Sequence, residues 1–305
     1  MTTVKEILER RAVLVTGKGG VGKTAIAAGL AHVAAASGKR TLVGEISYEP
    51  DATSPLARAL GVEKTTSHPT RVAPNLRAML LTPTDGHARF LRHTLHVGVL
   101  ADAAMRSAVI RRFLLAAPML PEMGILYRIL DLVREKRSDG SPEHEVIIVD
   151  LPATGHTLGL AQIPKAILGV IRSGPIATAV REGLELLEDQ KRTTTIVVTL
   201  PEALPVSEAV ELVRGLRAHA IPLSGIVLNR MPSDPFEPSE RHAIDSIVAR
   251  AGPLLGARTL PRIDRAKAAL ARVKSEIGTV IACIGELADQ DALAPQIGHA
   301  LAGGT

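Results

Sequence analysis

Short apolar runs alternate along most of the chain with segments whose apolar residues recur at helical spacing. Several runs contain no polar interruption, which is typical of strands buried on both faces of a parallel sheet. Strands are predicted at residues 12–16, 41–46, 75–81, 145–149, 193–200 and 223–228, with a weaker candidate at 257–260. Because helical patterns separate these strands, for example over 24–37, 207–218 and 239–251, we predict an α/β fold with a doubly wound, mostly parallel sheet.

One long stretch, residues 86–136, breaks this alternation. It has no strand pattern, and its apolar residues recur at helical spacing with breaks at Pro118 and Pro121. We interpret it as a helical insertion within a single domain that spans residues 1–305. The segment 265–301 also has a helical pattern, with a break near 289–291.

The composition narrows the class of protein. A single cysteine, Cys283, allows no intrachain disulfide and no multi-cysteine metal cage, which fits a reducing compartment. No apolar run approaches the roughly 18 residues that a membrane helix needs. Charged residues near the start, including Lys5 and Glu6, argue against a signal peptide. We therefore expect a soluble, cytoplasmic protein without a transmembrane segment.

The net charge of +5 raises the question of nucleic-acid binding. The arginines are scattered, and no block of five or six like charges occurs. Aromatic residues make up only 2% of the chain, so it lacks the rings on which single-stranded bases stack. The sequence argues against a nucleic-acid partner.

A glycine-rich segment between the first predicted strand and the first predicted helix fits the P-loop pattern. Its residues are Gly17, Lys18, Gly19, Gly20, Val21, Gly22, Lys23 and Thr24. Backbone N–H groups in such a loop turn inward around phosphate oxygens, and the following helix adds its positive end. Lys23 is expected to reach the β- and γ-phosphates of ATP, and the Thr24 hydroxyl to ligate Mg²⁺.

Lys18 narrows the range of ATPases that this loop resembles. The sequence Lys-Gly-Gly-Val-Gly-Lys-Thr resembles the deviant Walker ATPases, which include partition, Min-system, nitrogenase-iron-protein and arsenite-pump relatives. The resemblance implies that Lys18 crosses a dimer interface to the nucleotide of the facing subunit. The implied partner is a second copy or a paralogous ATPase.

A second motif follows the predicted strand 145–149. Asp150 precedes Leu-Pro-Ala-Thr-Gly-His-Thr-Leu, which resembles the switch of arsenite-pump ATPases and of ATPases that deliver tail-anchored membrane proteins. Partition and Min-system proteins lack the Gly-His-Thr segment. By resemblance, Asp150 holds Mg²⁺ directly or through water, Gly155 approaches the γ-phosphate, and His156 belongs to the switch.

The resemblance also supplies the remaining candidate residues. Asn229 matches the asparagine that bonds the adenine edge, and the segment Leu260-Pro261-Arg262 resembles a later loop that packs on the base. The nucleotide-binding set therefore adds Ala25, Arg230 and Pro261, while Lys18, Lys23 and Asp150 form the catalytic set.

Ser47 departs from the family pattern. It stands where relatives carry an aspartate that helps to activate the attacking water, and a serine hydroxyl is a poor proton acceptor. Glu45, Glu49 and Asp51 are candidate substitutes. We expect ATP binding with slow hydrolysis. A non-hydrolysing subunit that scaffolds a paralogous ATPase, and a partition- or Min-type positioning ATPase, are the alternatives.

The predicted insertion is rich in methionine and aliphatic residues, which suits a groove for varied apolar helices. In targeting relatives this region forms such a groove, so the resemblance implies an apolar client helix. The alternative is that these side chains pack into the main core. The apolar residues concerned are Met79, Phe90, Leu91, Leu95, Val97, Leu100, Met105, Ile110, Phe113, Leu114, Leu115, Met119, Leu120, Met123, Ile125, Leu126, Ile129, Leu130 and Leu132.

Overall fold

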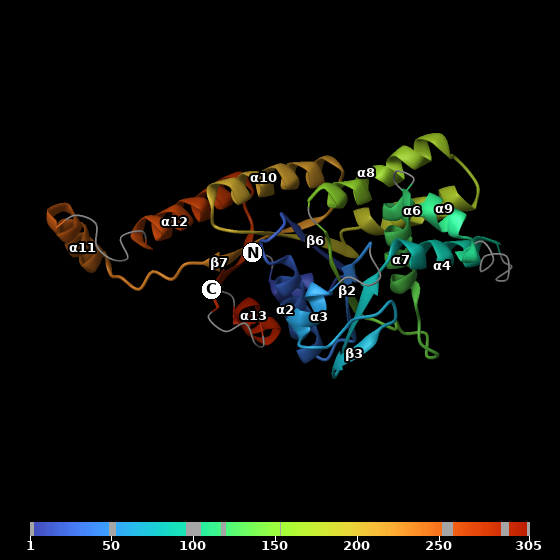
Figure 1. Cartoon of the computed structure of the whole chain (residues 1–305), viewed down its shortest axis with the longest axis horizontal. Coiled ribbons are helices and arrows are strands. Elements are labelled where there is room, and N and C mark those ends of the chain that lie inside the picture. Colours follow the sequence, from blue (N-terminus) through green and yellow to red (C-terminus); the bar gives the residue numbers. More distant parts are fainter. Residues whose placement is uncertain are drawn as a thin grey trace.

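The computed structural model describes residues 3–48, 53–95, 105–116, 120–152, 154–251, 259–287 and 293–303. Within them an eight-stranded sheet runs through the centre in the order β3-β4-β2-β5-β1-β6-β7-β8 (Figure 1). Every neighbouring pair is parallel except β3 and β4. The strands are β1 Ala12–Gly17, β2 Thr41–Ile46, β3 Thr70–Ala73, β4 Leu76–Leu81, β5 Val146–Asp150, β6 Thr193–Thr199, β7 Leu223–Met231 and β8 Val280–Gly285.

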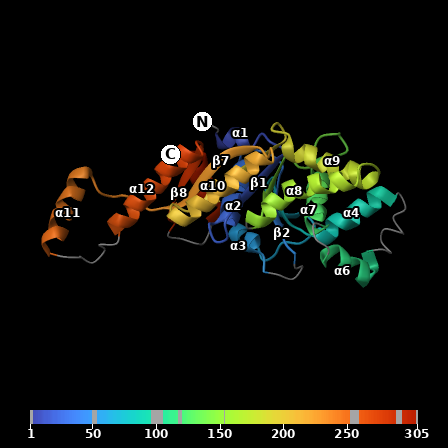
Figure 2. The ribbon, with the colours of Figure 1, turned by 90° about the horizontal axis from the view of Figure 1, so that it is seen from above.

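Helices cover both faces of this sheet. One face carries α1 Val4–Ile7, α2 Lys23–Ala36, α3 Pro55–Leu60 and α13 Leu293–Gly303. The other carries α7 Leu120–Arg134, α8 Thr154–Val170, α9 Pro175–Glu188, α10 Ala203–Ala218 and α12 Thr259–Glu276. Two further helices, α4 Pro83–Leu95 and α6 Ala108–Ala116, gather with α7 and α9 at one end of the molecule, and α11 Pro238–Ala251 lies at the opposite end (Figures 1 and 2).

Strand β1 illustrates why the sheet is buried on both sides. Val13 and Val15 point into the core beneath α2, whereas Ala12 and Leu14 point into the core beneath α7 and α10. All four side chains are almost completely buried. The uninterrupted apolar run therefore reflects two cores, one on each face, and confirms the predicted α/β class with its mostly parallel sheet.

Two predictions near the C-terminal end were wrong. The candidate strand at 257–260 fails because Thr259 and Leu260 begin α12, whose residues Ile263 and Ala266 continue the buried helical face. The predicted helical segment 265–301 contains strand β8, which pairs in parallel with β7. A short apolar run such as that of β8 fits a strand or a buried helix equally well, so periodicity alone does not decide between them. Strand β3 was also missed.

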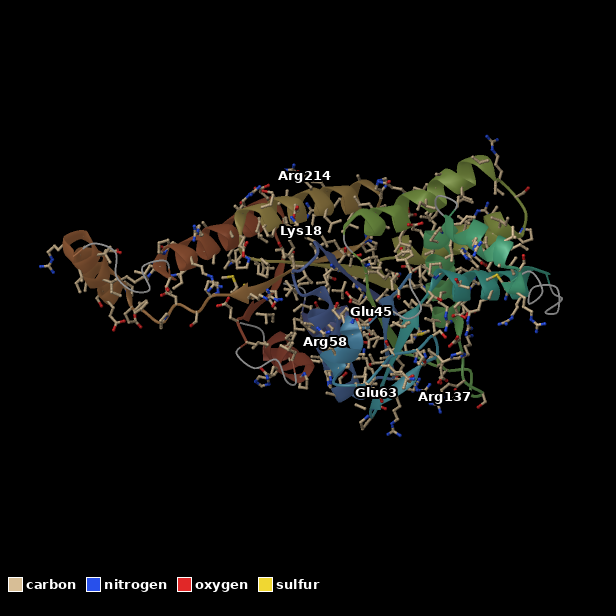
Figure 3. The ribbon with its side chains drawn as sticks, viewed as in Figure 1. Lys18, Glu45, Arg58, Glu63, Arg137 and Arg214 are labelled. Atoms are coloured by element: carbon tan, nitrogen blue, oxygen red, sulfur yellow. The ribbon has the colours of Figure 1, made fainter. Side chains whose placement is uncertain are left out.

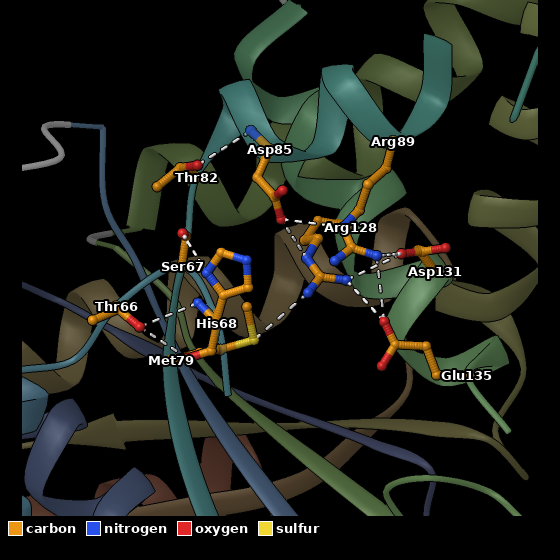
Figure 4. Close-up of polar contacts among 10 residues, drawn as sticks. All are labelled: Thr66, Ser67, His68, Met79, Thr82, Asp85, Arg89, Arg128, Asp131 and Glu135. Carbon is orange, nitrogen blue, oxygen red and sulfur yellow. Dashed lines mark hydrogen bonds and ion pairs between the residues drawn. The ribbon is translucent and has the colours of Figure 1, made fainter. Parts of the chain in front are cut away.

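Between β4 and β5 the helices α4, α6 and α7 are followed by a non-helical turn over residues 135–145, and α4 begins at Pro83, slightly before the predicted start at residue 86. Arg128 on α7 is only 1% exposed and forms ion pairs with Asp85 on α4 at 2.7 Å and with Asp131 at 3.1 Å (Figure 4). Arg89 on α4 reaches Asp131 at 2.7 Å. Because a buried guanidinium is costly unless it is paired, this network holds α4 against α7 in a defined register.

No helix in the described part of the chain combines the length and apolarity required to cross a bilayer.

Candidate functional site

The P-loop residues connect β1, at the centre of the sheet, to the start of α2. Strand β5 lies beside β1 and ends at Asp150, and Glu45 of β2 pairs in register with Asp150. The carboxyl ends of neighbouring parallel strands, at the point where the chain direction switches across the sheet, are the usual ligand site of this architecture. The fold therefore brings the two sequence motifs together.

Two glycines of the loop are required by its geometry. Gly22 has φ +91°, and a Cβ atom there would lie 2.2 Å from Nδ2 of Asn229. Gly17 has φ +149°, and a Cβ atom there would lie 2.2 Å from the carbonyl oxygen of Val198 on β6. Both the left-handed backbone and the close approach exclude larger residues.

Asn229, in the C-terminal half of β7, contacts this loop and stabilises it. Its side-chain amide donates to the carbonyl oxygen of Val21 at 2.9 Å, and its Oδ1 accepts from the backbone N–H of Arg230 at 3.0 Å. Both Val21 and Asn229 are buried. This contact was not anticipated from the sequence, since it joins residues 208 positions apart.

Thr24 and Asp150 form the polar centre of the site. The Thr24 hydroxyl donates to Oδ2 of Asp150 at 2.5 Å, while the other oxygen, Oδ1, is buried without a hydrogen-bond partner. Burial raises the pKa of Asp150 to about 6, and Glu45 adds to the increase, whereas Thr24 and Lys23 oppose it. A hydroxyl next to an unsatisfied carboxylate oxygen is a donor set that suits Mg²⁺.

Lys23, the first residue of α2, turns back over the loop, where its ammonium group donates to the carbonyl oxygen of Lys18 at 3.0 Å. Burial lowers the pKa of Lys23, and Asp150 acts in the opposite direction. The ammonium group thus lies against the glycine-rich loop, where it can meet an anion.

Lys18 forms an ion pair within its own chain. Its Nζ lies 2.5 Å from Oε1 of Glu208 on α10, and both side chains are partly exposed. Figure 3 shows Lys18 beneath α10, the helix that also carries Arg214. No sequence motif pointed to Glu208, because its partner lies 190 residues away.

Ser47 lies just after β2, and its backbone N–H donates to the carbonyl oxygen of Leu81 at 3.0 Å. Among the candidate substitutes for an aspartate here, Glu45 accepts from the Ser54 hydroxyl and from the backbone N–H of Leu56 at the start of α3. Burial raises the pKa of Glu45, and these two hydrogen bonds oppose that rise. Its carboxylate therefore holds α3 in place. Glu49 and Asp51 lie outside the described residues.

The remaining predicted residues lie on three different helices. Ala25 lies in the first turn of α2 and Gly155 in the first turn of α8, while the His156 side chain lies outside the described residues. The expected loop at Leu260-Pro261-Arg262 is instead the start of α12. Proline is accommodated in the first turn of a helix, where its missing N–H has no partner to lose.

Arg230 borders a cavity with a volume of about 650 Å³ between the start of α10 and α12. Its lining combines apolar side chains with six charged ones, and Arg230 itself has φ +56°. The charged residues of this cavity are Glu202, Arg230, Arg262, Arg265, Arg272 and Glu286. Of these residues, Arg230 was predicted as a binding residue and Arg262 belonged to the expected base-packing segment, whereas the other four carry no motif.

Three proteins that are similar to this chain are all named as ATPases. The chain is 28% identical over 261 residues to ATPase BagA of Mycobacterium tuberculosis, covering 82% of this chain and 75% of that protein. It is 28% identical over 270 residues to ATPase ASNA1 homolog 1 of Paramecium tetraurelia, covering 75% and 78%. It is also 28% identical over 227 residues to the arsenical pump-driving ATPase of Escherichia coli, covering 72% of this chain but 35% of that protein.

The family model described as anion-transporting ATPase matches residues 10–173, more than half of the 305-residue chain. The match includes the P-loop, Ser47 and the Asp150 segment. Together with the geometry of Lys23, Thr24 and Asp150, it shows that this chain belongs to the anion-transporting ATPase family.

Proposed function

We propose that the chain binds ATP with Mg²⁺ and acts as a dimer-dependent ATPase switch with slow turnover. The observation that carries this proposal is the contact of Thr24 with Asp150, whose second carboxylate oxygen is buried and unsatisfied. The P-loop amides would surround the phosphates, and Lys23 would move from the Lys18 carbonyl to the β- and γ-phosphate oxygens. Mg²⁺, when bound by Thr24 and, directly or through water, by Asp150, would neutralise charge on those phosphates.

The outer parts of the nucleotide are assigned to the remaining predicted residues. Gly155, at the start of α8, is assigned to the γ-phosphate side. Asn229 uses one amide hydrogen on Val21, and its second hydrogen is assigned to the adenine edge. Ala25, Arg230 and Pro261 complete the assigned set.

Slow turnover is proposed because the position expected to orient the attacking water is Ser47. A serine supplies no negative charge for this task, and the nearby Glu45 carboxylate already accepts two hydrogen bonds at the start of α3. If the water-positioning group is the only missing part, then an acidic side chain at residue 47 restores turnover.

In the proposed dimer, Lys18 would contact the nucleotide of the facing subunit. In this chain Glu208 holds the Lys18 ammonium group at 2.5 Å, so closing two subunits would exchange this carboxylate for the phosphates of the facing subunit. The partner would be a second copy or a paralogous ATPase. Because both side chains are substantially exposed, the ion pair is weak enough to be exchanged.

The test is ATP hydrolysis measured against chain concentration. We expect the rate per chain to be low and to rise with concentration, to fall at least tenfold in Lys18→Ala, and to reach its maximum at lower concentration in Glu208→Gln, where Lys18 is released. Ser47→Asp is expected to raise the maximal rate at least tenfold.

Glu211→Gln, which changes an exposed carboxylate on the same helix, is the matched control and should behave as the original chain. A rate independent of concentration and of Lys18 would disprove dimer dependence. Fast turnover with Ser47 in place would disprove the slow-switch proposal. ATP binding without hydrolysis in both forms would instead favour the scaffold alternative, and tight binding to nonspecific DNA would favour a positioning ATPase.

An apolar cavity at the helical end of the molecule supports a second proposed role, the binding of an apolar client helix. The cavity has a volume of about 320 Å³ and lies among α4, α6, α7, α8 and α9. Its aliphatic and aromatic lining includes Phe90, Leu91, Leu114, Met123, Ile167 and Ile176. Leu115 on α6 and Ile176 on α9 are 41% and 44% exposed, so apolar surface reaches the solvent here.

Other residues first considered for this groove belong to the core. Met79 lies on β4 and is fully buried, as are Ile125, Leu126, Ile129, Leu130 and Leu132 on α7. Leu95, Val97, Leu100, Phe113 and Met119 have no described side chains.

We expect Leu114→Asp and Met123→Asp to weaken the binding of a fluorescent apolar helical peptide at least tenfold. Leu204→Asp, at a 62% exposed position on α10, should leave it unchanged. Equal binding by all variants in a fluorescence titration would reject the client proposal.

A further inference from the structure

We propose that the amino-terminal edge of the sheet carries a second anion site, which binds a small phosphate-bearing polyanion such as pyrophosphate. The site is a cavity of about 320 Å³ that we call the edge cavity. Its polar lining consists of Arg40, Thr41, Arg71, Asn75, Arg77, Arg137, Glu143 and His144.

The edge cavity is separate from the nucleotide site. Arg40 precedes β2, Asn75 precedes β4 and His144 precedes β5, whereas the P-loop follows the far end of β1. These strands run parallel, and one of six residues spans about 20 Å, so the two sites lie at opposite ends of the sheet. Figure 3 shows this separation, with Lys18 near the top of the sheet and Arg137 near its lower edge.

Two arginines of the cavity face each other across the antiparallel pair. Arg71 on β3 and Arg77 on β4 are directly opposite in register. Like charges in this position destabilise a strand pair. Arg77 is partly compensated by Glu143 at 2.8 Å, whereas Arg71 has no ion pair with any other described residue. An anion between the two guanidinium groups would turn this repulsion into a favourable contact.

Two further arginines complete the basic lining. Arg40 donates to the Pro142 carbonyl oxygen at 3.0 Å and lies 3.4 Å from Glu145, but its buried Nε has no hydrogen-bond partner. Arg137 is exposed in the adjacent turn and forms no ion pair within the part of the chain that is described. Asp139, in the same turn, accepts from the backbone N–H and hydroxyl of Ser141. The lining thus sets four arginines against one carboxylate, that of Glu143.

His144 supplies the observation that points to a ligand. The residue is only 2% exposed, and its Nε2 is buried without a hydrogen-bond partner. Burial lowers the pKa of His144 to about 4, with Arg77, Arg11 and Arg128 in the same direction and Glu143 opposing them. The ring is therefore neutral at pH 7, and in one tautomer its Nε2 can donate to a ligand oxygen. In that tautomer the buried N–H is costly unless such an acceptor is present.

The chemistry of the lining selects phosphate oxygens. Guanidinium groups bind phosphate through two parallel N–H···O bonds, and several arginines around one cavity suit an anion with more than one charge. A free anion and a lipid headgroup share this chemistry. The cavity volume accommodates a diphosphate group but not a folded nucleic acid.

The test uses the full chain carrying Lys23→Ala, which weakens the P-loop as a competing phosphate site. We expect calorimetry with pyrophosphate to detect binding that Arg71→Gln and Arg137→Gln, added singly, each weaken at least tenfold. Arg58→Gln, at an exposed position on α3, is the matched control and should leave the affinity unchanged. Circular dichroism should show that all variants fold alike, since the replaced side chains are exposed.

A parallel arm measures flotation of the same proteins with phosphatidylcholine vesicles that contain phosphatidic acid. Pyrophosphate binding lost in both arginine variants supports a free anion as ligand. Vesicle binding alone, lost in the same variants, supports the same site with a lipid source. Pyrophosphate affinity and vesicle binding that are unaffected by Arg71 and Arg137, or that are undetectable in the Arg58→Gln control, overturn the proposal. None of these outcomes depends on ATP hydrolysis.

Discussion

Lys23→Ala is expected to reduce the affinity for ATP at least 100-fold and to remove hydrolysis. The Lys23 ammonium group lies within the P-loop and currently donates to the Lys18 carbonyl oxygen, so a triphosphate has only to replace one neutral acceptor. A charge-assisted contact with phosphate is worth more than a neutral hydrogen bond, and burial strengthens it. Isothermal calorimetry with Mg²⁺ and ATP measures the affinity directly.

Lys191→Ala is the matched control, because Lys191 is exposed in the turn before β6 and its side chain faces solvent. Its ATP affinity should equal that of the original chain. Retained ATP binding in Lys23→Ala, with the same heat per mole, would show that the nucleotide does not occupy this loop.

Asp150→Asn is expected to abolish Mg²⁺-dependent turnover, by at least 100-fold, and at the same time to stabilise the protein without metal. The carboxylate is 6% exposed and one of its oxygens has no partner, so ionisation is costly in the absence of a cation. A neutral amide of the same shape removes that cost and still accepts from Thr24. The opposite signs of the two effects distinguish a metal ligand from a residue that only maintains the fold.

The pH dependence follows from the pKa of Asp150, which rises from 3.8 to about 6 on folding. Between these values the folded state binds more protons than the unfolded state. The contribution of Asp150 to the free energy of unfolding therefore falls as the pH rises, and the whole decrease is present above pH 6. A shift of about two pKa units corresponds to roughly 3 kcal/mol as an upper limit.

Thermal denaturation without metal should therefore show Asp150→Asn melting higher than the original chain at pH 8, with no difference near pH 4. Added Mg²⁺ should raise the melting temperature of the original chain at pH 8 and leave that of Asp150→Asn unchanged. The exposed control Asp245→Asn on α11 should match the original chain throughout. A lower melting temperature for Asp150→Asn at pH 8 would contradict the assigned burial cost.

The local sequence pattern was sufficient to predict much of the fold. The apolar runs predicted six of the eight strands, because a strand that is buried on both faces is mostly apolar along its whole length. The glycine spacing also predicted a loop between a strand and a helix at residues 17–24, and this segment connects β1 to α2. Asp150 was singled out because it ends a buried strand, and it lies within the residues that the family model matches, while its role as a magnesium ligand stays a prediction.

Tertiary structure alone decided the contacts between distant segments. The contact of Asn229 with Val21, the pairing of Lys18 with Glu208 and the opposition of Arg71 to Arg77 all depend on which strands are neighbours and in which register. Strand order depends on contacts across the whole sheet, so the residues of one strand do not determine which strands lie beside it. For the same reason, β8 and the first turn of α12 were misassigned: a short apolar run becomes a strand only where a neighbouring strand, here β7, offers its free edge.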